Sequence, residues 1–122
     1  MKLIKTMTAV TFVVDAMPPW KQPPADECEK RRQAERKKAL QEKAREIFKT
    51  SPPLFTPCAV SIRYSRKDGK SDSANIVGGV LDSLENIVFK NDNQVKEIFY
   101  AEWQGDKDWY QATVTKLVAH LK

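Results

Sequence analysis

Two aspartates, Asp72 and Asp92, are the side chains whose spacing could support hydrolytic chemistry in this chain. A run with the apolar spacing of one helical face lies between them, formed by Ile76, Val77, Val80, Leu81 and Leu84. Three further apolar residues, 87–89, then predict a short buried strand. A carboxylate at a helix start and another after the next strand can converge, and their oxygens suit magnesium. The stretch therefore predicts a magnesium site made by Asp72 and Asp92.

The predicted helix has marked ends and an unusual interior. The hydroxyl of Ser73 can cap its start, and Asn86 can end it in a left-handed turn. Gly78 and Gly79 lie inside it, where each costs about 1 kcal/mol relative to alanine. Tight packing on a sheet would offset that cost. The close approach of another backbone, a partner helix or a phosphate would also offset it.

The same stretch resembles the core of the RusA-like family of Holliday junction resolvases, which are small dimeric endonucleases. That family shows an Asp-x-Asp-Asn turn, a helix with an inward lysine, "LDAL", "NG", a short strand and "DDxQV". The matching residues here are Asp72, Asn75, Leu81-Asp82-Ser83-Leu84, Asn86, Phe89, Asp92 and Gln94-Val95. The order of the flanking elements also agrees with the family.

The resemblance implies an α+β fold, with a small mixed, mainly antiparallel sheet of four to five strands and two helices packed on it. It implies a magnesium-dependent endodeoxyribonuclease, with manganese as a second usable ion, that acts as a homodimer on Holliday junctions and other branched DNA in recombination and repair. Asp72 and Asp92 would bind the metal, and Asn75 would orient an acid or a phosphate oxygen. Asp82 lies about 80° around the helix from Asp72, so we expect it to contact the metal ligands rather than the metal itself.

Three positions depart from the family pattern. The second acid of the first turn falls on Ala74, the helix lysine on Gly78, and the first acid of the "DD" pair on Asn91. Lys70 could supply the positive charge that is missing at Gly78. These departures leave an alternative function, a dimer that binds branched DNA without cutting it. A structural α/β domain with a basic surface is a third interpretation.

Composition limits the other classes of function. The 122 residues fit one domain, 1–122, and the net charge of +5 favours a polyanionic partner. Only Cys28, Cys58 and His120 could serve as thiol or imidazole ligands, and no CxxC pair exists, which argues against a zinc site. We expect reduced thiols, a cytoplasmic protein associated with the nucleoid, no membrane partner and no small-molecule substrate.

Basic side chains gather in three places. The helix predicted at 26–49, with Asp26 as its N-cap, is almost entirely charged in its first half. The candidate DNA contacts are Arg31, Arg32 and Lys38 on that helix, Arg66, Lys67 and Lys70 in the turn 65–71, and Lys21 in the proline-rich segment 15–24. A solvated surface is the alternative for the helix and for the turn. Trp20 could stack on a base or cover the edge of the core.

Alternation predicts the remaining strands. Residues 7–14 are favoured as a strand, with a place in the middle of the sheet, over a signal peptide, because Thr8, Thr11 and Asp15 interrupt the apolar run. A second strand is expected at 58–64. Residues 95–103 and 109–117 are expected to form a β-hairpin around the turn 104–108.

Overall fold

Four strands, two α-helices and one short 3-10 helix make up the described part of this protein. A computed structural model describes the backbone of residues 2–120 and the side chains of residues 9–117. Its elements are β1 (Lys2–Val14), α1 (Glu27–Ile47), β2 (Cys58–Arg66), α2 (Ser73–Leu84), the short 3-10 helix η1 (Asp92–Gln94), β3 (Val95–Gln104) and β4 (Trp109–His120). The α+β fold class is confirmed. No helix in the described part of the chain is long and apolar enough to cross a membrane.

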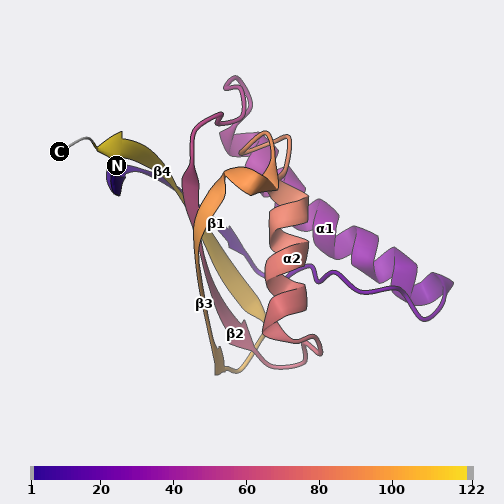
Figure 1. The fold of residues 1–122 in the computed structure, drawn as a ribbon. Coiled ribbons are helices and arrows are strands. Elements are labelled where there is room, and N and C mark those ends of the chain that lie inside the picture. Colours follow the sequence, from indigo (N-terminus) through magenta and orange to yellow (C-terminus); the bar gives the residue numbers. More distant parts are fainter. Residues whose placement is uncertain (1, 121–122) are drawn as a thin grey trace.

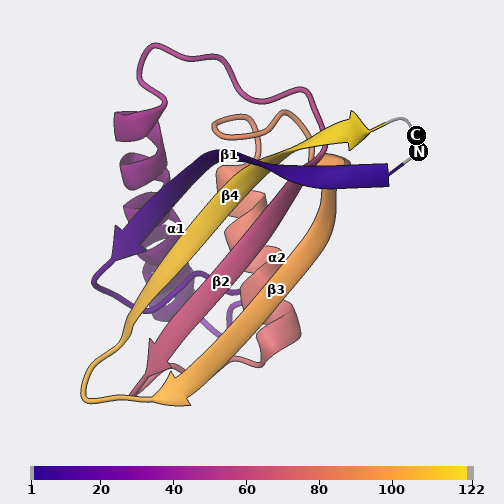
Figure 2. The ribbon, with the colours of Figure 1, turned by 90° about the vertical axis from the view of Figure 1, so that its left-hand side faces the viewer.

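The sheet has the strand order β1-β4-β2-β3. β4 is antiparallel to both β1 and β2, whereas β2 and β3 are parallel. Both helices lie on one face of the sheet, and the other face is uncovered (Figures 1 and 2). The sheet is therefore mixed and mainly antiparallel, as expected.

The expected hairpin of 95–103 with 109–117 is wrong, because β2 lies between the two strands. The turn that joins them crosses the end of β2: Gly105 N–H donates to the Arg66 carbonyl at 3.0 Å, and Ser65 Oγ donates to the Lys107 carbonyl at 3.2 Å. Alternation within each strand predicted which residues point inward. It carries no information on which strand is inserted between two others.

Two further strand predictions need correction. β1 is an edge strand rather than a central one, since it pairs only with β4; Val13, on its outer face, is 52% exposed. Residues 87–89 form a turn instead of a strand. Within that turn Phe89 makes only isolated bridges to Leu54 and Glu85, although Val88 and Phe89 are fully buried as expected.

The core lies between the helices and the covered face of the sheet. Its strand residues alternate as the sequence predicts and include Phe12, Val14, Cys58, Val60, Ile62, Tyr64, Tyr110, Ala112 and Val114. α2 contributes Ile76, Val80 and Leu84, while α1 contributes only Leu40 and Ala44 from its C-terminal half. Asp26 caps α1, as expected, by accepting from Glu29 N–H at 2.8 Å. The charged first half of α1 extends beyond the sheet (Figure 1).

The paired glycines of α2 are explained by the loop between β1 and α1. A Cβ built on Gly79 would lie 2.5 Å from the Pro19 carbonyl oxygen, so only glycine lets this backbone lie against the helix. Lys21 N–H donates to the Asn75 carbonyl at 2.9 Å and continues the contact. At Gly78 the nearest atoms belong to the Lys21 side chain, at 3.5 Å. The close approach of another backbone, one of the expected reasons, is therefore the cause at Gly79.

The two glycines make a matched pair for a stability test. Gly79→Ala should lower the free energy of unfolding by about 1–3 kcal/mol, because the new methyl group forces the loop off the helix. Gly78→Ala adds a methyl at ordinary contact distance and should raise it by up to about 1 kcal/mol through helix propensity. Urea unfolding measures both. Equal stabilities of the two variants would contradict the proposed contact.

Candidate functional site

Asp72 is the N-cap of α2. Its Oδ1 accepts a hydrogen bond from Asn75 N–H at 2.8 Å, so the expectation that Ser73 caps this helix is wrong. The carboxylate is fixed at the helix start, where the aligned peptide dipoles favour negative charge. It is also exposed, and this bond uses only one of its two oxygens. Asn75 holds Asp72 through its backbone, not through the side-chain amide.

Asp92 begins η1, just after α2 and the turn 86–90. Its N–H donates to Glu85 Oε2 at 2.9 Å, so it lies beside the residue that ends α2. Asn91 and Gln94 form a capping box around this turn. Gln94 Nε2 also donates to the carbonyls of Leu54 and Thr56, at 2.8 and 3.0 Å. Asp92 is thus exposed on a well-anchored turn.

The structure does not bring Asp72 and Asp92 together within one chain. They flank the two ends of α2, whose 12 residues span about 18 Å (Figure 1). A strand at 87–89 would have carried the chain back along the helix, but these residues turn at its C-terminal end instead. Among the residues that the structure describes, no group of three or more histidine, cysteine or acidic side chains could hold a metal ion.

Arg66 is used inside the protein rather than presented to a ligand. Its guanidinium donates to both carboxylate oxygens of Glu102 at 2.8 Å, and to the carbonyls of Gly69 and Ser71 at 2.9 and 2.8 Å. The same guanidinium holds the pKa of Glu102 below its ordinary value. The arginine side chain is only 14% exposed. We therefore no longer expect Arg66 to contact DNA.

Asp108 fixes the loop that leads to Asp72. Its carboxylate accepts from the N–H groups of Lys67, Asp68 and Gly69, at 2.9, 2.8 and 3.2 Å, and from the Tyr64 hydroxyl. Burial alone would raise the pKa of Asp108, but these hydrogen bonds outweigh it and hold the pKa below its ordinary value. Asp108 and Arg66 therefore anchor this loop to the rest of the protein.

The other predicted residues fall into two groups. Asp82 pairs with Lys37 of α1 at 3.0 Å, so it faces the neighbouring helix rather than either aspartate of the predicted site. The remaining cations are exposed, with Arg32 and Lys38 in loose pairs to Glu29 and Glu42 at 3.8 Å. Those exposed cations are Lys21, Arg31, Arg32, Lys38, Lys67 and Lys70. Lys67 and Lys70 lie in the loop before Asp72, while Lys21 crosses α2 beside Asn75.

Asp108 and the contact of Arg36 with Trp20 were not foreseen from the sequence, although Trp20 itself was considered as a base-stacking residue. The Arg36 guanidinium lies 3.6 Å from the centre of the Trp20 ring. Asp106 lies in the turn just before Asp108. From the local sequence, either aspartate could be the one that accepts the loop N–H groups. A tryptophan in a proline-rich segment was the only signal for the stacked pair.

Acid should remove the contribution of Asp108 to stability. Because the folded pKa is depressed, this contribution is fully present above the unfolded pKa of about 4 and is lost as the pH falls through the folded value. Asp108→Asn should therefore lower the free energy of unfolding by about 1–3 kcal/mol at pH 7, and the difference should shrink below about pH 4. Urea unfolding across pH checks this, with Asp106→Asn as an exposed control on the same turn. A pH-independent difference would contradict it.

No curated protein matches the chain significantly. The family model described as "Endodeoxyribonuclease RusA" matches residues 5–115, which include all four strands in part or whole, both helices and the two aspartates. The resemblance seen around residues 70–95 therefore extends over nearly the whole chain. This chain belongs to the RusA endodeoxyribonuclease family.

Proposed function

We propose that this protein is a structure-specific endodeoxyribonuclease that hydrolyses Holliday junctions and other branched DNA during recombination and repair. The observation that carries the proposal is the family match over residues 5–115 together with acids at two of the family's positions, Asp72 and Asp92. The family is one of nucleases that generally depend on a divalent metal. Magnesium, with manganese as a substitute, is our proposal for the ion here.

One chain does not fit such an ion, because α2 separates the two carboxylates. We infer that the site forms only in a homodimer, with two copies of α2 antiparallel across a two-fold axis. That arrangement sets Asp72 of one copy beside Asp92 of the other. Glu85, which accepts from Asp92 N–H, would come with it and supply a carboxylate where the family's second acid is missing at Ala74.

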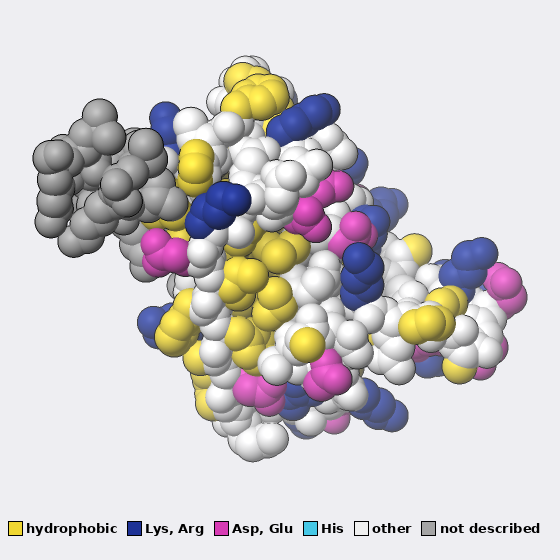
Figure 3. Space-filling model, in the orientation of Figure 1, with side chains coloured by type: hydrophobic (Ala, Val, Ile, Leu, Met, Phe, Trp, Pro, Cys, Tyr) yellow, Lys and Arg dark blue, Asp and Glu magenta, His cyan; other side chains and the backbone are white. Residues whose placement is uncertain are grey.

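An apolar surface supports this choice of interface. Val77 and Leu81 are partly exposed on the flank of α2 opposite its contacts with α1. Ile98 and Tyr100 lie on the helix-facing side of β3, and Ile98 is 51% exposed. Figure 3 shows hydrophobic side chains gathered between these two elements. A contiguous apolar patch of this kind is typical of a surface that binds another protein.

Positive charge at the start of α2 would hold the DNA phosphates. Lys67 and Lys70 come from the anchored loop before Asp72. Lys21 comes from the loop across α2, where its side chain passes over Gly78 and its N–H binds the Asn75 carbonyl. We propose that Lys21, more than Lys70, supplies the charge that a lysine at position 78 would bring. A bound divalent ion would add positive charge against the transferring phosphoryl group.

Removing either carboxylate should stop cleavage without unfolding the protein. Asp72→Asn keeps an N-cap residue of similar strength, and Asp92 is exposed on its turn. Each variant should lose about 100-fold or more of the magnesium-dependent nicking of a four-way junction, the scale expected when a metal site is disturbed. Electrophoresis of cleaved strands measures this, with junction affinity as the control for folding. Wild-type cleavage by Asp72→Asn would exclude Asp72 from the site.

Mixing the two inactive variants distinguishes a shared site from one made within a chain. In a mixed dimer of Asp72→Asn with Asp92→Asn, a site shared between copies leaves one aspartate pair intact and one doubly changed. Random pairing makes half of the dimers mixed, so about a quarter of wild-type activity should return. If each chain formed its own site, both sites of every mixed dimer would be defective. Co-refolded mixtures assayed on the same junction should therefore regain activity, and a dead mixture of dimers would refute the shared site.

A further inference from the structure

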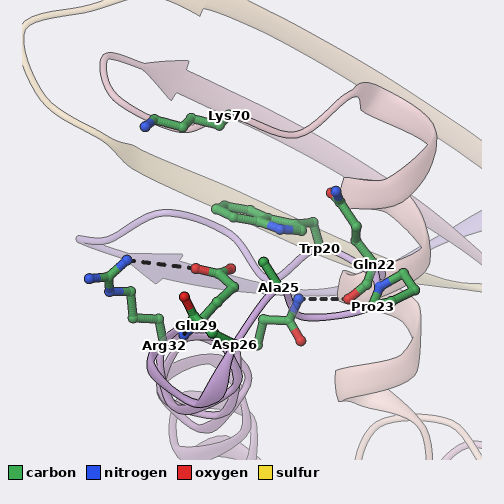
Figure 4. Close-up of a pocket in the computed structure, with 9 residues that line it drawn as sticks. Trp20, Gln22, Pro23, Ala25, Asp26, Glu29, Arg32 and Lys70 are labelled. Atoms are coloured by element: carbon green, nitrogen blue, oxygen red, sulfur yellow. Dashed lines mark hydrogen bonds and ion pairs between the residues drawn. The ribbon is translucent and has the colours of Figure 1, made fainter.

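A hollow of about 360 Å³ lies between the β1–α1 loop, the first turns of α1 and the loop before Asp72. Its walls are formed by Trp20, Gln22, Pro23, Ala25, Asp26, Glu29, Arg32, Gln33 and Lys70. Figure 4 shows the indole of Trp20 between Lys70 on one side and the start of α1 on the other. A concave site of a few hundred Å³ with one large aromatic wall suits a flat ring system.

The aromatic wall is held firmly in place. Arg36 stacks on Trp20 at 3.6 Å and is itself paired with Glu29 at 2.8 Å. The arginine side chain is only 11% exposed, so this contact is part of the folded interior. The loop is held to both helices, because Gln33 Nε2 of α1 donates to the Gln22 carbonyl at 2.7 Å and Lys21 N–H donates to the Asn75 carbonyl of α2. A preformed surface lowers the entropy cost of binding a ring.

The charges around the hollow favour an aromatic group that carries phosphates. Lys70 is exposed at one rim, and Arg32 is 64% exposed at the other. The two acids in the wall are already engaged: Asp26 caps α1, and Glu29 pairs with Arg36 and Arg32. A base on the indole, with its neighbouring phosphates at Lys70 and Arg32, would meet both kinds of partner.

We propose that this hollow binds one unpaired nucleobase of branched DNA, stacked on Trp20, with the flanking phosphates on Lys70 and Arg32. The inference rests on the proposed function and gives a physical reason for this protein to prefer branched DNA to a plain duplex. A base inside a duplex is stacked on both faces and paired at its edge, so it cannot enter. A base must leave its stack to fill the hollow, and this costs least at a branch point, where stacking is already interrupted. Because Lys70 lies two residues before Asp72, the filled hollow places the strand that carries this base beside the proposed metal ligand.

Trp20→Ala should weaken binding to a four-way junction about tenfold or more, the usual loss for one base-stacking aromatic residue. Affinity for a fully paired duplex of the same sequence should not change, and Trp20→Phe should keep most of the junction affinity. Binding is measured by fluorescence anisotropy without metal, so that no cleavage occurs. The duplex affinity shows whether the variant protein is still folded.

A second measurement does not depend on removing Trp20. In a Trp103→Phe, Trp109→Phe background, Trp20 is the remaining tryptophan, and a stacked base should quench its emission when the junction binds but not when the duplex binds. Junction binding with neither quenching nor a loss in Trp20→Ala would overturn the base site and leave the nuclease proposal standing. A wild-type protein that binds no junction would overturn both.

Discussion

The contact between the Pro19–Lys21 backbone and α2 is the constraint on which the rest of the structure depends. At Gly79 the backbone of Pro19 and Trp20 lies so close that no Cβ can fit. The next loop residue, Lys21, donates its N–H to the Asn75 carbonyl. This contact sets the path of a segment whose prolines remove backbone donors. It also decides where Trp20 and Lys21 point, so both the predicted phosphate contact and the hollow exist because of it.

Alternation and capping predicted most helices and strands of this fold, but not which strands lie next to each other in the sheet. Cys58, Val60, Ile62 and Tyr64 point into the core as their spacing indicates, because a strand with one covered face must alternate. The hairpin failed for a different reason. Pairing partners are chosen by the whole sheet: Tyr110 of β4 pairs with Val14 on one side and with Tyr64 on the other, and all three side chains are buried. Nothing in the β3 or β4 sequence alone could reveal that insertion.

The same distinction, between local patterns and distant partners, applies to the candidate site. Asp72 and Asp92 were proposed from the sequence, but their expected convergence needed a strand at 87–89, where the chain turns instead. Short apolar runs specify burial, which Val88 and Phe89 achieve, without specifying direction. Asp108 was missed because its role needs three N–H groups from a loop about 40 residues earlier, and no local pattern marks such an acceptor. The ion pair of Arg66 was missed for the same reason, since Glu102 is equally remote in sequence.

The departure at Gly78 occurs where the β1–α1 loop crosses α2. The Lys21 stem lies 3.5 Å from where a Cβ would be, so a side chain at position 78 would begin in contact with that stem. A lysine at position 78 and Lys21 would thus lie side by side over the same turn of α2, and in this chain the lysine there belongs to the loop. A cation can stabilise a phosphate from any segment of the chain, provided that it lies in the right position.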